Sequence, residues 1–122
     1  MSEVVFPWPP RELSPNARVH WSKKAKAAKR YKLACWALVK EAKATVDWDG
    51  PVHLWITFHT PSQRTNDVDN CVAAIKSGLD GLALALGIND SRFVLQPWIS
   101  DRTAGSVVVR LSSGPELAGG VS

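Results

Sequence analysis

The sequence predicts a small α+β domain in which a mixed or antiparallel β-sheet packs against two main helices. Two stretches carry apolar residues at spacings of three and four, as amphipathic helices do, and another alternates apolar and polar residues, as a strand does. The 122 residues suffice for one ordinary domain with a modest core. We therefore expect one domain over residues 1–111 and a disordered tail over residues 112–122, which are small and polar.

The first third of the chain is expected to hold one strand and one helix. Val4–Phe6 is typical of a short strand that stops at the following prolines, because proline lacks the N–H that a strand ladder needs. After a loop over residues 12–20, a helix is expected over residues 22–44, with Ser22 as its N-cap. Its apolar stripe consists of Ala28, Tyr31, Cys35, Leu38 and Ala42.

A turn cluster at residues 47–51 separates this helix from the clearest strand. Residues 52–59 alternate strictly, which predicts a strand with one face in the core. After the polar residues 61–66, a second amphipathic helix is expected over residues 68–86, ending at Gly87. Its apolar positions are Val68, Val72, Ile75, Leu79, Leu82 and Leu86.

Two glycines inside the second predicted helix, Gly78 and Gly81, need a physical reason. Each costs about 1 kcal/mol relative to alanine in a helix interior. Close packing against another backbone, in this chain or in a second subunit, would explain them. Two further strands are expected at residues 93–99 and 106–111.

Positive charge is concentrated in one part of the sequence. Between Arg11 and Lys43 there are ten Lys or Arg residues against two Glu, a net charge of about +8 in a chain whose total is +4. Such asymmetry is expected of a phosphate-binding face, although a run of charges is often only a solvated helix face. The candidate DNA contacts are Asn16, Arg18, Trp21, Lys23, Lys24, Lys26, Lys29 and Arg30.

Other features favour a cytoplasmic protein without an organic cofactor. The sequence has no apolar run of 18 residues and no signal-peptide pattern, so we expect a soluble protein with no membrane partner. Cys35 and Cys71 lack the spacing of a zinc site and are expected to be buried, reduced thiols. The histidines His20, His53 and His59 share no motif spacing and are expected to be structural.

Asp67 and Asp69 stand where a polar loop meets the second predicted helix. If Asp67 precedes the first helical turn, both carboxylates can face one point. Their mutual repulsion would then favour a bound cation. Oxygen ligands without cysteine suit Mg²⁺, with Mn²⁺ as a possible substitute. The alternative is that both aspartates only cap the helix.

Asp90 and Lys76 are further candidates for the same site. A straight helix over residues 69–86 would separate its ends by about 26 Å, so Asp90 can join Asp69 only if the helix is shorter and the loop folds back, or if a second subunit contributes. Otherwise Asp90 is a turn residue. Lys76 lies on the same helix face as Asp69 and could meet a scissile phosphate, or it could simply pair with Asp80.

Short segments on either side of the basic helix add a more specific signal. Pro9–Pro10, Ser14–Asn16 and Trp21 precede it, and Asn66–Asn70 and Asn89–Ser91 follow it. In this order they resemble the RusA family of Holliday junction resolvases, including phage and prophage members, over roughly residues 5–110. The most specific element is Asp-x-Asp-Asn leading into an apolar helix, with an aspartate-containing loop about twenty residues later.

This resemblance implies an α+β endonuclease domain over residues 1–111 that acts as a homodimer in DNA recombination and repair. It implies Mg²⁺-dependent paired nicking of four-way DNA junctions, with Asp67, Asp69 and Asp90 as the metal-binding catalytic carboxylates. The family's catalytic lysine follows the second aspartate by one helical turn, where this chain has Ala73, so Lys76 is the nearest replacement. Asn89 stands where the family often has a further aspartate.

Two other functions fit the same residues. A non-catalytic DNA-binding module would use the basic helix while the aspartates only cap. A metal-dependent nuclease for other branched or flap DNA would keep the same site but cut substrates without a four-way centre.

Overall fold

The computed structural model describes residues 2–63 and 66–114. Of the tail predicted over residues 112–122, residues 115–122 lie outside the described residues. Ser112 belongs to the last strand, so the sheet extends one residue beyond the predicted boundary.

A four-stranded mixed sheet forms one layer of the fold. Its strands are β1 (Ser2–Pro7), β2 (Val52–His59), β3 (Phe93–Ile99) and β4 (Ser106–Ser112), in the order β1-β4-β2-β3. β4 pairs antiparallel with both β1 and β2, whereas β3 pairs parallel with β2 at the edge. The predicted α+β class with a mixed sheet is confirmed.

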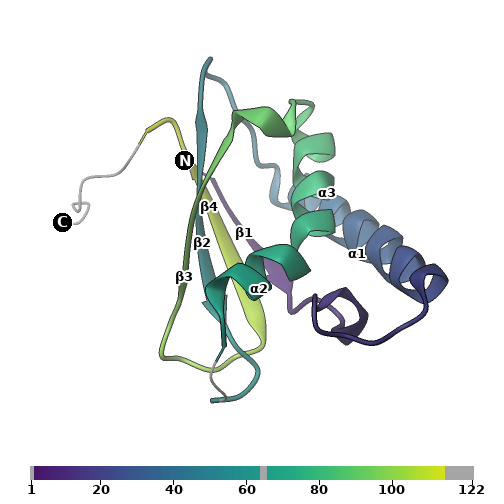
Figure 1. Ribbon diagram of the computed structural model, residues 1–122. Coiled ribbons are helices and arrows are strands. Elements are labelled where there is room, and N and C mark those ends of the chain that lie inside the picture. Colours follow the sequence, from purple (N-terminus) through teal and green to yellow (C-terminus); the bar gives the residue numbers. More distant parts are fainter. Residues whose placement is uncertain (1, 64–65, 115–122) are drawn as a thin grey trace.

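Three α-helices form the second layer: α1 (Trp21–Ala42), α2 (Val68–Ala74) and α3 (Lys76–Leu86). Figure 1 shows α1 and α3 side by side on one face of the sheet, with α2 crossing near its lower end. Short 3₁₀ helices, η1 (Arg11–Leu13) and η2 (Asp90–Arg92), lie in the connections. The core between the layers includes Phe6, Leu54, Ile56 and Phe58 from the sheet and Tyr31, Cys35, Leu79 and Leu82 from the helices.

The start and the buried stripe of α1 differ from the prediction. His20, not Ser22, is the N-cap, because its Nδ1 accepts a hydrogen bond of 3.2 Å from the backbone N–H of Ser22. The buried residues are Ala27, Tyr31, Cys35 and Val39, an uninterrupted row with a spacing of four. The predicted stripe mixed spacings of three and four, and it therefore included Ala42, which is exposed.

The single helix predicted over residues 68–86 is wrong, because the helix breaks at Ile75. This residue has φ −96° and ψ 7°, outside the helical region, and separates α2 from α3. Ile75 itself is completely buried. The break lets the first segment lie against β3 while the second packs along α1. Helical periodicity continued through the break, so the sequence pattern alone did not reveal it.

Gly78 and Gly81 pack against α1, which confirms the predicted close approach and shows that it occurs within one chain. A β-carbon at Gly81 would collide with the backbone carbonyl oxygen of Lys32. At Gly78 it would lie 2.7 Å from Cε2 of Tyr31 and 3.0 Å from Sγ of Cys35. The small residues therefore set the separation of the two helices.

Both cysteines are buried free thiols, as predicted. Burial raises the pKa of the Cys35 thiol to about 12. Within residues 2–63 and 66–114, none of the helices combines the length and the apolar character needed to cross a membrane.

Candidate functional site

A cleft of about 440 Å³ lies between the segment that follows β1 and the start of α2. Asn16 and Arg11 line one wall, whereas Asp67 and Asn70 line the other. We call this hollow the Asp67 cleft. It brings Asn16, a predicted DNA contact, to the same cavity as Asp67, a predicted catalytic residue.

A smaller depression of about 200 Å³ lies beside the Asp67 cleft, since Ala74 lines both. Lys24 of α1 and Lys76 of α3 line this depression together with Asp80. Lys24 was predicted to contact DNA and Lys76 to act in catalysis. In this depression too, a predicted DNA contact and a predicted catalytic residue therefore lie beside each other.

Asp67 is the N-cap of α2 and Asp69 lies in its first turn, so Asp67 precedes the helix as predicted. Asp67 is extended, with φ −98° and ψ 125°, and its Oδ1 accepts a 2.8 Å hydrogen bond from the backbone N–H of Asp69. Asp67 therefore caps α2, and this hydrogen bond engages one of its two carboxylate oxygens. Both aspartates are exposed. Beneath them, burial and the negative charge of Asp67 raise the pKa of the Cys71 thiol.

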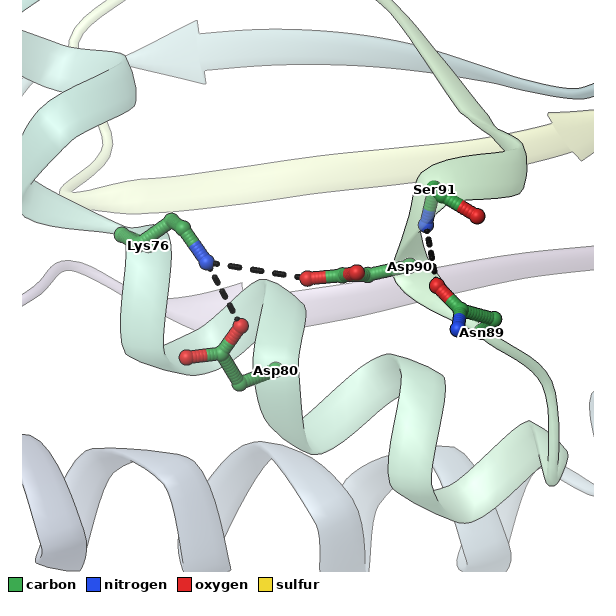
Figure 2. A network of polar contacts seen from close by, with 5 residues as sticks. All are labelled: Lys76, Asp80, Asn89, Asp90 and Ser91. Atoms are coloured by element: carbon green, nitrogen blue, oxygen red, sulfur yellow. Dashed lines mark hydrogen bonds and ion pairs between the residues drawn. The ribbon is translucent and has the colours of Figure 1, made fainter.

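Lys76 and Asp90 are brought together across the loop that follows α3. Figure 2 shows the Lys76 ammonium between two carboxylates, 2.8 Å from Oδ1 of Asp80 and 3.8 Å from Oδ2 of Asp90. A 2.8 Å bond from the Ser91 N–H to Oδ1 of Asn89 holds the turn. The hydrogen bond with Asp80, and to a smaller extent the charges of both aspartates, raise the pKa of Lys76. The predicted Lys76–Asp80 pair is confirmed. The helix is shorter than predicted, but the loop after α3 brings Asp90 to Lys76 and not into a cluster with Asp67 and Asp69 among the described residues.

The three candidate carboxylates are not gathered into one cluster. Among the described residues, no group of three or more His, Cys, Asp or Glu side chains is arranged to hold a metal ion. Asp90 faces Lys76, whereas Asp67 faces the cleft. Within one chain, the structure therefore presents two aspartates at the start of α2 and a third that is paired with a lysine.

The predicted DNA-binding residues are all exposed. Trp21 is 75% exposed, unusual for so large an apolar side chain, and its ring lies 5.5 Å from that of His20. The set comprises Asn16, Arg18, Trp21, Lys23, Lys24, Lys26, Lys29 and Arg30.

The histidines have identifiable structural surroundings. His20 caps α1, and Nδ1 of His59 lies 2.6 Å from Oγ of Ser100. His53 is partly buried on the strand face opposite the core residues of β2. None of the three lines the Asp67 cleft.

Several residues of the cleft were not predicted as site residues. Trp8 and Arg11 line the cleft but lie outside the Asp-x-Asp-Asn pattern, and no periodicity marked them. Asn70 was part of that pattern, so its position beside two aspartates in the sequence could have marked it as a site residue. Asp80 was considered only as an ion-pair partner, although it positions Lys76.

Comparison with known proteins identifies one relative. No family model matches the chain. An uncharacterized protein of Xylella fastidiosa (strain Temecula1 / ATCC 700964) is 40% identical over 117 residues, covering 92% of this chain and 76% of that protein. The chain belongs to the same family as this Xylella protein. The similarity therefore extends over most of the chain.

Proposed function

We propose that this protein is a Mg²⁺-dependent endonuclease that resolves four-way DNA junctions in the cytoplasm by paired strand nicking, as a homodimer of the RusA type. The observation that carries the proposal is the pair of adjoining hollows beside α2. One joins Asn16 with Asp67, and the other joins Lys24 with Lys76. Residues suited to holding DNA thus lie beside residues suited to cutting it.

The basic face of α1 supports a nucleic-acid substrate. Lys23, Lys24, Lys26, Lys29 and Arg30 are exposed, and the segment from Arg11 to Lys43 carries about +8. Phosphate contacts of this kind position a duplex without reading its sequence. The exposed ring of Trp21 offers a stacking surface at the start of the same helix.

Asp67 and Asp69 are the residues that would hold the metal ion. Their exposed carboxylates offer oxygen donors without thiol or imidazole, a set that suits Mg²⁺ or Mn²⁺, ions that bind one or two carboxylates and keep several waters. When bound, the ion supplies activation of water and neutralisation of charge on the phosphate. Asp90 would complete the set of metal-binding carboxylates in one of two ways. It would break its contact with Lys76 in the same chain, or Asp90 of the partner subunit would take the place.

Lys76 contributes a positive charge beside the same site. The Lys76 ammonium is charged at neutral pH, as in any solvated lysine, and Asp80 holds it by a 2.8 Å contact. An ammonium placed near the phosphate stabilises the negative charge that develops during hydrolysis. In a two-fold dimer, two such sites can act on opposed strands of a four-way junction.

A non-catalytic DNA-binding module is the second candidate. It is favoured by the capping role of the Asp67 carboxylate and by the absence of a three-carboxylate cluster among residues 2–63 and 66–114. On this alternative, the protein binds junctions without metal and leaves both strands intact.

The deciding experiment is cleavage of a labelled synthetic four-way junction, compared with a linear duplex and with a flap substrate. We expect symmetric nicks that require Mg²⁺, stop in EDTA and fall roughly a hundredfold or more in Asp69→Asn. Asp47→Asn, the same chemical change at an exposed turn residue outside both hollows, should cut like the wild type.

Tight junction binding without nicks under every metal condition would support the binding module instead. Efficient cutting of flaps but not of four-way junctions would support a nuclease whose substrate is flap DNA.

A further inference from the structure

The Asp67 cleft is not lined like a phosphate site. Among the lining residues that the structure describes, Arg11 is the one cation and Asp67 the one anion, so their charges balance, and the others are neutral. The neutral lining combines the apolar surfaces of Trp8, Pro9 and Pro10 with the amides of Asn16, Asn66 and Asn70. A flat, neutral group with hydrogen-bonding edges fits this lining better than a phosphate does.

Two of these amides are available to a ligand. In the part of the chain that the structure describes, the side chains of Asn16 and Asn70 hydrogen-bond no other residue. Each amide offers two N–H donors and a carbonyl acceptor. They belong to opposite walls, so a group between them can be recognised along two edges.

The apolar side of the cleft is already held in place. The ring of Trp8 meets that of Phe58 edge-on, with centroids 6.1 Å apart and planes at 79°. Phe58 is completely buried, and the Trp8 backbone N–H donates to the Gly105 carbonyl at 3.3 Å. The Trp8 wall therefore needs little ordering when a ligand enters.

We propose that the Asp67 cleft binds one unpaired nucleobase, that of the nucleotide next to the scissile phosphate. The inference rests on the proposed function, which places that phosphate at Asp67. A cavity of about 440 Å³ lies in the size range of small-molecule sites, about 300 to 1,000 Å³. Bases recognised in this way are read by polar contacts to their edges and by packing against apolar or aromatic walls.

This role would give the enzyme a physical reason to prefer branched DNA. A base inside a duplex is stacked and paired, so extracting it costs free energy. A base at a branch point has already lost part of that stabilisation. The cleft would thus select the substrate through the state of one base, independently of the phosphate contacts made by α1.

The first test measures base dependence without cleavage. Amide and indole resonances are followed by NMR in EDTA while a short single-stranded oligonucleotide is added, and the titration is repeated with an abasic strand of the same length. We expect the side-chain signals of Asn16, Asn70 and Trp8 to shift only with the base-containing strand, and the amide of Gln96 on β3 to stay unchanged. Equal shifts with both strands would identify a backbone-binding cleft and overturn the proposal, as would no shift with either.

The second test uses the junction itself. Once the nicked phosphate is mapped, each adjoining nucleotide is replaced in turn by an abasic one, and a nucleotide within an arm serves as the control. We expect one adjoining replacement to slow cleavage roughly 5- to 150-fold, the range typical of losing one base contact. Unchanged or faster cleavage at both positions would overturn the inference while leaving the nuclease intact.

Variants link the two tests to the cleft. Asn16→Ala and Asn70→Ala should each remove the preference for the base-containing strand, whereas Gln96→Ala should retain it. If the wild type fails to cut any junction but the base-dependent shifts persist, the proposed function fails and the base-binding cleft stands.

Discussion

The two faces of α3 show how differently neighbouring residues of one helix are constrained. On the face toward α1, Gly78 and Gly81 leave no room for one added carbon atom. On the outer face, Lys76 and Asp80 form an ion pair in which the lysine is 65% exposed. The inner face therefore sets the position of the helix, while the outer face carries solvated charges that contribute little to stability.

The largest expected effect is on the inner face. Gly81→Ala forces a β-carbon against a backbone carbonyl, so we expect a loss of about 3 kcal/mol in the free energy of unfolding, measured by chemical denaturation. Gly78→Ala should cost less, because the Tyr31 ring can shift a little although its hydroxyl donates to the Pro7 carbonyl at 2.7 Å. Stabilisation of either variant, as at an unhindered helical glycine, would refute the close packing.

An intermediate effect is expected where Cys35 meets the same inner face. Burial holds the pKa of this thiol at about 12, against an ordinary value of 9.0. Above pH 9 the unfolded chain loses this proton first, so stability falls with rising pH between about 9 and 12. From pH 7 to pH 10, the wild type should lose about 1 kcal/mol more than Cys35→Ala, measured under reducing conditions. Parallel losses in the two proteins would show that Cys35 is not the titrating group.

The smallest expected effect on stability is at the outer face. Asp80→Asn removes the closer partner of Lys76, yet exposed ion pairs contribute only about 0 to 1 kcal/mol. We expect the denaturation midpoint to change little, and the pKa of Lys76 to fall because its main hydrogen bond to a carboxylate is lost. Leu84→Ala, at another exposed position of α3, provides the control. A loss as large as that of Gly81→Ala would remove the distinction between the two faces.

The sequence by itself determined much of the local structure. Strict alternation located β2, and apolar periodicity located α1 and most of α2 and α3. These predictions succeed because the apolar residues of a buried face recur with the period of the helix or strand that carries them. The aspartate pair at the start of a helix was also visible, since a capping position depends only on neighbouring residues.

Only the tertiary structure decided how these elements meet. The break at Ile75 left no mark in the periodicity, because buried residues continue on both sides of it. The fold-back of Asp90 onto Lys76 and the joining of Asn16 with Asp67 link residues far apart in the chain. Such contacts depend on the packing of α3 against α1 and on the sheet order, neither of which is encoded in a local pattern. The charged and amide side chains could be identified from the sequence, but the cleft that they line is formed only by the tertiary structure.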